Sequence, residues 1–66
     1  MASREEVSVA VAEAERVFES LSYAVYWIDE PNPALGGKSP RSMLDLPDGL
    51  TLVLRELKSV EYGLPI

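Results

Sequence analysis

The ten residues from Pro31 to Pro40, PNPALGGKSP, restrict the fold of this chain more than any other stretch. They hold three of the five prolines and two of the four glycines of a 66-residue sequence. Because proline lacks a backbone N–H and clashes with a preceding helical turn, no regular helix or central strand can continue through them. The chain therefore divides into two halves joined by a stiff connection.

The N-terminal half is predicted to form two helices. Its first helix begins with Ser3 and Glu6, which match a capping box. Ser20 or Ser22 then caps a second helix that stops before Pro31. Apolar residues recur at steps of three and four along the first helix, as one buried face requires: Val7, Val11, Ala14, Val17, Phe18 and Leu21. The second helix carries Tyr23, Ala24, Trp27 and Ile28, with the single tryptophan expected in the core.

The C-terminal half is predicted to form a short and a longer helix. Ser39 caps the short helix and Pro40 takes its first position, before Met43 and Leu44. The longer helix runs from about Pro47 to about Glu61, leaves Leu52 exposed and ends at Gly63 in a left-handed conformation. It is expected to bury Leu50, Val53, Leu54, Leu57 and Val60. The fold class is all-α, a small domain of about four helices with a structured Pro/Gly loop between helices 2 and 3.

Composition argues against catalysis and against nucleic-acid binding. The chain has no cysteine and no histidine, so it lacks a disulfide, the usual zinc ligands, a thiolate nucleophile and an imidazole base. We predict no enzyme, no cofactor and no metal site. The net charge of −5 disfavours contact with a phosphate backbone. The acidic residues are concentrated in residues 1–30, where they either form a solvated helix face or attract a basic partner.

No apolar run is long enough to span a bilayer, and the N-terminus lacks the basic start and apolar core of a signal peptide. These features predict a cytoplasmic protein without a membrane partner.

The Pro/Gly loop has two interpretations. Gly36 and Gly37 permit positive φ, so the loop is expected to present free backbone N–H groups before a helix start, where an anion could bind. The stretch does not match a phosphate-binding P-loop, because Asn32 stands where that motif needs glycine. The other interpretation is a rigid interhelical turn in which Leu35 fills the core.

The order of residues along 14–66 resembles the toxin-binding domain of Xre/MbcA/ParS-type antitoxins. The resemblance is carried by Phe18, Ala24, Trp27-Ile28, the PNPALGGKSP stretch, Leu44, Gly49, Val53, Leu57 and Val60-Glu61-Tyr62-Gly63. It implies an antitoxin of a type II toxin-antitoxin system. The partner would be a RES-domain toxin that consumes NAD or transfers ADP-ribose from it, and the antitoxin would block its NAD pocket. It also implies self-association or a larger assembly with the toxin.

The resemblance assigns residues to two roles. It implies that Trp27, Leu35, Leu44, Val53 and Leu57 serve mainly the fold. The toxin-facing candidates are Asn32, Gly36, Gly37, Lys38, Tyr62, Gly63, Leu64 and Ile66.

Residues 1–66 are expected to form one toxin-binding domain, with the start of the N-terminal helix in 1–13 and no helix-turn-helix domain for binding DNA. Two residues depart from the family pattern. Arg41 replaces an apolar residue, and Leu46 stands where a Ser or Thr cap is usual, so Asp45 or Asp48 is expected to cap the last helix. The alternative function is a helical dimerisation or adaptor domain, in which the stripe from Val7 to Leu21 pairs with a second copy.

Overall fold

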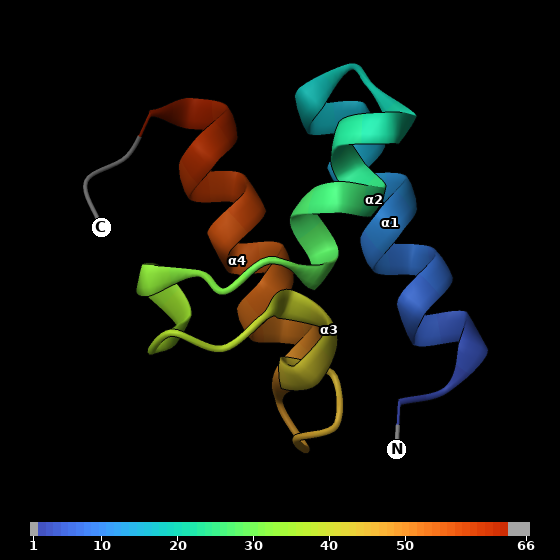
Figure 1. The fold of residues 1–66 in the computed structure, drawn as a ribbon, viewed down its shortest axis with the longest axis vertical. Coiled ribbons are helices and arrows are strands. Elements are labelled where there is room, and N and C mark those ends of the chain that lie inside the picture. The colour runs from blue at the N-terminus through green and yellow to red at the C-terminus, as the bar shows by residue number, and fades with distance from the viewer. Residues whose placement is uncertain (1, 64–66) are drawn as a thin grey trace.

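The computed structural model describes residues 2–63. Its elements are α1 (Arg4–Phe18), α2 (Leu21–Asp29), the 3-10 helix η1 (Pro33–Leu35), α3 (Pro40–Met43) and α4 (Gly49–Tyr62) (Figure 1). Within 2–63 the only β-type pairing is an isolated antiparallel bridge between Asn32 and Lys38. The prediction of a small all-α domain with a structured loop between the second and third helices is confirmed.

Side-chain caps begin the first three α-helices as their sequences predict. The Ser3 hydroxyl accepts from the Glu6 N–H, and the Ser3 N–H donates to the Glu6 carboxylate, both at 3.1 Å. Ser20, rather than Ser22, caps α2 by accepting from the Tyr23 N–H at 3.1 Å. Ser39 caps α3 in the same way. Each cap satisfies an N–H that the helix itself leaves without a partner.

The start of α4 differs from the prediction. Asp48 occupies the N-cap position, but its side chain makes no capping hydrogen bond. Asp45 accepts from the Ala2 N–H at 2.6 Å and so holds the beginning of the chain against the turn before α4. The expected carboxylate cap is therefore wrong.

The four α-helices enclose one core. α1 packs against α2 and α4, and α3 also packs against α2 and α4, so the first and last helices meet. Trp27 lies in this core as predicted. The buried apolar residues are Ala10, Ala14, Ala24, Trp27, Ile28, Met43, Leu44, Val53 and Leu57. No helix within residues 2–63 has both the length and the apolar character needed to cross a membrane.

Three predictions about burial are wrong. Leu21 is exposed because α1 ends at Phe18, where Glu19 turns the chain with φ 56°, and Leu21 then opens α2. Val60 is 42% exposed because the buried residues of α4 end at Leu57, one turn earlier. Leu52 is half-buried and packs against the core, although it was expected to be exposed.

A close backbone contact joins α3 to α4 at Gly49. Gly49 is buried, and a Cβ atom placed on it would lie 1.7 Å from the Met43 carbonyl oxygen and 2.8 Å from the Leu44 Cα. Because these neighbours are backbone atoms, no rotamer change can make room. Only glycine lets the short turn after α3 pack directly on the first residue of α4.

Replacing Gly49 with alanine should strongly destabilise the domain. We expect Gly49→Ala to lower the free energy of unfolding by about 1–3 kcal/mol or more, the usual effect of overpacking, out of the roughly 3–10 kcal/mol typical of a domain of this size. Urea unfolding followed by circular dichroism measures the change. Thr51→Ala, at an exposed position of the same helix, is the control, and equal midpoints for the two variants would contradict the close contact.

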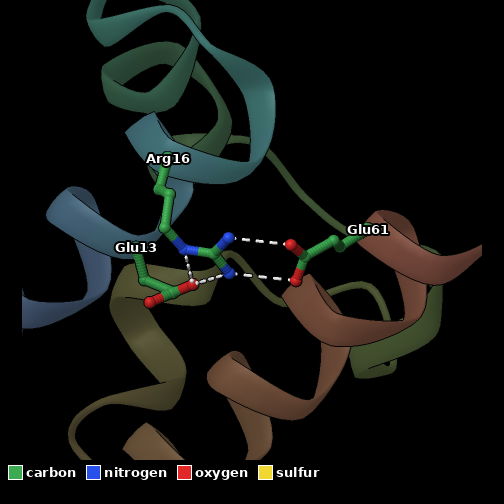
Figure 2. Close-up of polar contacts among 3 residues, drawn as sticks. All are labelled: Glu13, Arg16 and Glu61. Carbon is green, nitrogen blue, oxygen red and sulfur yellow. Dashed lines mark hydrogen bonds and ion pairs between the residues drawn. The ribbon is translucent and has the colours of Figure 1, made fainter.

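An ion-pair cluster joins α1 to the last turn of α4 (Figure 2). The Arg16 guanidinium donates to both carboxylate oxygens of Glu61, at 2.7 and 2.9 Å, and also to Glu13 one turn earlier on α1. The hydrogen bond from Arg16 lowers the pKa of the Glu61 carboxyl below its usual value. This cluster orients the end of α4 next to Tyr62.

The Arg16–Glu61 pair should stabilise the domain in a pH-dependent way. A carboxyl with a lowered pKa in the folded state stabilises it above the unfolded pKa of about 4.3, and this contribution is lost as the pH falls through the lowered value. Glu61→Gln should therefore melt below the parent chain at about pH 7 and approach it near about pH 2–3.

Thermal unfolding of both chains across this pH range measures the effect. Glu15→Gln, which removes an exposed carboxylate without an ion pair among the described residues, is the control. A gap between parent and Glu61→Gln that stays constant down to low pH would show that the ionised pair contributes nothing.

Candidate functional site

The Pro/Gly loop is closed by its own backbone hydrogen bonds. The Asn32 N–H donates to the Lys38 carbonyl at 3.0 Å and forms the base of the loop. Inside it, the N–H groups of Leu35 and Gly37 both donate to the Asn32 carbonyl, at 2.9 and 3.0 Å. The Gly36 and Lys38 N–H groups donate to the carbonyls of Pro33 and Leu35, and the Ala34 N–H donates to the Asn32 side chain.

Every backbone N–H from residue 32 to 38 thus has an acceptor within the loop. The expectation of free N–H groups that could cradle an anion is wrong, because the 3-10 turn and the bridge use them all. The loop is a closed, shaped surface, and Leu35 is half-buried and packs against the core. A loop with its hydrogen bonds already formed loses little conformational entropy when a partner docks on it.

The candidate loop residues differ in their tasks. Asn32 organises the loop, since its side chain accepts from the Ala34 N–H at 2.9 Å and its carbonyl accepts twice. Gly36 and Gly37 have φ of 70° and 83°, which L side chains rarely adopt, and both are exposed. No described atom would meet a Cβ atom at either glycine. Glycine is favoured at both positions because of the backbone conformation, not because a side chain would lack space within the domain.

Lys38 lies at the exposed end of the loop. No carboxylate of residues 2–63 forms an ion pair with it. Its ammonium group is therefore available to an acidic group of another molecule.

The C-terminal candidates lie at the end of α4. Tyr62 is the last helical residue and is 65% exposed, so it does not pack into the core. Gly63 closes the helix with φ 63° and donates to the Val60 carbonyl, which confirms the predicted left-handed end. Leu64 and Ile66 lie outside the described residues. In Figure 1 the loop and the end of α4 are both drawn toward the left of the view, with α1 on the right.

A cleft of about 280 Å³ lies beside the loop. Its walls are Tyr23, Tyr26, Trp27 and Glu30 from α2 and its C-terminal end, and Pro31, Asn32 and Pro33 from the loop. The candidate set includes only Asn32 of these residues. The sequence did contain a signal, because positions 23, 26, 27 and 30 follow the i, i+3, i+4, i+7 spacing of one helix face, although the spacing alone does not distinguish an exposed face from a core.

A larger hollow of about 550 Å³ lies at the surface between α1 and α4. Glu13, Arg16, Thr51, Leu54, Arg55 and Lys58 line it, and none of these is a predicted site residue. Within residues 2–63, no group of three or more Asp and Glu side chains is arranged to hold a metal ion.

The two departures from the family pattern have structural explanations. The Arg41 Nε donates to the Asp29 carboxylate at 2.6 Å, which ties α3 to the end of α2 and raises the pKa of Arg41. The Leu46 carbonyl accepts from the Gly49 N–H at 3.0 Å. The first N–H of α4 is therefore satisfied by a backbone carbonyl instead of a capping side chain. Arg41 thus forms an ion pair with another residue of the same domain.

Comparison with known proteins identifies a family and one partial relative. A stretch of 38 residues is 50% identical to part of a phosphoenolpyruvate-protein phosphotransferase from Streptomyces coelicolor. That stretch is 58% of this chain but spans only 7% of the length of that protein, so nothing about the activity of that enzyme transfers to this chain. No solved structure matches the chain.

The family match covers the elements described above. The antitoxin Xre/MbcA/ParS C-terminal toxin-binding domain matches residues 13–63, well over half of the sequence. The matched range includes the loop, the cleft beside it and the Glu61-Tyr62-Gly63 end of α4. The chain belongs to the family of Xre/MbcA/ParS antitoxin C-terminal toxin-binding domains.

Proposed function

We propose that this chain neutralises a RES-domain toxin, an enzyme that consumes NAD or transfers ADP-ribose from it, by covering the toxin's NAD pocket. The family match over residues 13–63 carries the proposal, since binding a toxin is what defines this family. On this proposal the chain acts in the cytoplasm as a binding domain, without catalysis of its own.

The toxin-facing surface would combine the closed loop and the end of α4. Gly36, Gly37 and Lys38 are exposed on a loop whose backbone is already hydrogen-bonded. Tyr62 offers an exposed aromatic ring, a residue type enriched at interface centres. Leu64 and Ile66 would follow it into the toxin pocket.

The alternative, a domain that pairs with itself through α1, has less support. The α1 stripe is used inside the domain, because Ala10 and Ala14 are fully buried and Val7, Val11, Val17 and Phe18 pack against the core. The stripe is therefore mostly used within one copy, and of its residues from Val7 to Leu21 only Leu21 is exposed.

Co-expression should show toxin neutralisation directly. A cognate RES-domain enzyme produced alone should lower cellular NAD and stop growth, and the full chain should restore both and co-purify with the enzyme. A chain ending at Gly63 should still fold, because the described core lies within residues 2–63, but should protect poorly. Continued NAD loss with the full chain would refute the proposed function, whereas full protection by the shortened chain would remove Leu64 and Ile66 from the site.

Single substitutions at exposed positions should weaken toxin binding without unfolding the domain. Tyr62→Ala should raise the dissociation constant more than about fivefold if the ring is an interface anchor. Lys38→Ala should mainly slow association, with an effect that shrinks at high salt. Surface plasmon resonance measures both, with Thr51→Ala as the matched control. Dissociation constants equal to that of the control would mean that the toxin docks elsewhere.

A further inference from the structure

The cleft beside the loop combines aromatic rings with a carboxylate. Tyr23, Tyr26 and Trp27 supply three rings, and Glu30 follows on the same face at the end of α2. Its volume of about 280 Å³ is just below the roughly 300–1,000 Å³ of typical small-molecule pockets. A single side chain of a partner protein is an occupant of suitable size.

The rings are held in place before any partner arrives. Tyr23 packs edge-on against Phe18, with ring centroids 4.8 Å apart, and Phe18 in turn lies 5.6 Å from Trp27. Tyr26 follows at 5.9 Å from Tyr23 and is 58% exposed. A partner side chain would therefore meet an ordered aromatic surface of which the outermost ring is largely open to solvent.

The carboxylate of Glu30 has no cation of its own. The ion pairs among the described residues use Glu13, Glu61 and Asp29, and none includes Glu30. The negative charge of Glu30 raises the pKa of the Tyr26 hydroxyl, which places this charge close to the ring. Tyr26 and Glu30 together present a π face and a negative charge that no cation of residues 2–63 pairs with.

The tyrosine rings and the Glu30 carboxylate of the cleft favour a cation as their ligand. The face of an aromatic ring attracts a positive charge, and the attraction strengthens as water is excluded. A carboxylate can accept two parallel hydrogen bonds from a guanidinium. Arginine suits both better than lysine, because its planar group stacks on a ring while its edge bonds to the acid.

The charge of the chain as a whole favours a basic partner surface. Residues 1–30 hold seven acidic side chains against Arg4 and Arg16, within a net charge of −5. Such a surface increases the rate at which a basic partner approaches. The cleft lies at the end of this acidic half, where the loop begins.

We propose that the cleft between α2 and the loop binds an arginine side chain of the partner protein, stacked on Tyr26 and Tyr23 and paired with the Glu30 carboxylate. This inference rests on the proposed function, in which the partner is the toxin. The cleft would be a further contact with the toxin, beside the loop and the end of α4. In it, a cationic side chain of the toxin would approach from the α2 face.

Toxin binding tests the role of the cleft in the complex. Glu30→Gln and Tyr26→Ala should each raise the dissociation constant roughly 5- to 30-fold, the range of a partly desolvated cation–π and charge contact. Tyr26→Phe keeps the ring and should lose least. Glu15→Gln removes the same charge elsewhere, and Val25→Ala truncates an exposed residue of α2 that does not line the cleft, so both should bind like the parent.

The recognition of arginine is tested with the full chain alone. Acetyl-Gly-Arg-Gly-amide should shift the Trp27 indole and Glu30 amide signals in ¹H–¹⁵N spectra in a saturable way. The same peptide with citrulline, which has nearly the same shape but no charge, should leave them in place. Equal shifts with both peptides, or none with either, would overturn the assignment of an arginine site.

The outcomes separate this inference from the proposed function. If Glu30→Gln and Tyr26→Ala bind the toxin like the parent while Tyr62→Ala does not, the cleft proposal fails and the toxin-binding function stands. If the parent chain does not bind the toxin at all, the proposed function fails and with it the role of the cleft in that complex. If Glu30→Gln and Tyr26→Ala weaken toxin binding while Glu15→Gln and Val25→Ala do not, and the spectra shift with the arginine peptide only, the arginine site is supported.

Discussion

The packing of the first helix against the last supports everything else in this domain. A chain of 66 residues without cysteine has neither a disulfide nor a large core to stabilise it. Here α1 packs against α4 and buries Ala10 and Ala14 in the core, and the Arg16 cluster ties the C-terminal ends of the two helices together. With its two ends joined, the chain packs α2 and α3 onto the same core as α1 and α4, and the loop and the end of α4 gain a fixed base.

The proposed partner-facing surface, made of the loop and the end of α4, is stiff for reasons of backbone chemistry. The loop satisfies its own N–H groups through the Asn32 bridge and the 3-10 turn, and the last turn of α4 is held by Arg16 and ended by Gly63. Prolines restrict the remaining freedom of the loop backbone, and the glycines supply the left-handed conformations that its turns need. A surface ordered in advance keeps more of its contact energy as affinity, which suits a domain whose family binds toxins. The same hydrogen bonds exclude the anion-binding interpretation, since an N–H used inside the loop cannot also hold a phosphate.

The charged side chains fall into two groups, those that form ion pairs between helices and those that form none among the described residues. Arg16 and Arg41 are engaged with carboxylates that link helices, whereas Lys38 and Glu30 have no ion-pair partner within residues 2–63. Opposite charges that form no ion pair within the described residues therefore lie near the two ends of the Pro/Gly loop. A docking protein can match both, and a protein of the wrong charge pattern would meet like charges at close range.

The sequence alone determined the helices, their caps at Ser3 and Ser39, the left-handed glycines and the family, because periodicity, capping residues and motif order are local properties. It placed the loop and Tyr62 among the candidates but did not reveal the cleft, since the spacing of Tyr23, Tyr26 and Glu30 is the same on a buried and an exposed helix face. Only the tertiary structure decided which faces are covered. It exposed Leu21 and Val60, brought the Gly49 backbone onto Met43, and directed Glu61 toward Arg16 while leaving Tyr62 exposed. These outcomes depend on how the helices end and pack in three dimensions, as in the Arg16–Glu61 pair between α1 and α4, which the period of a single helix does not encode.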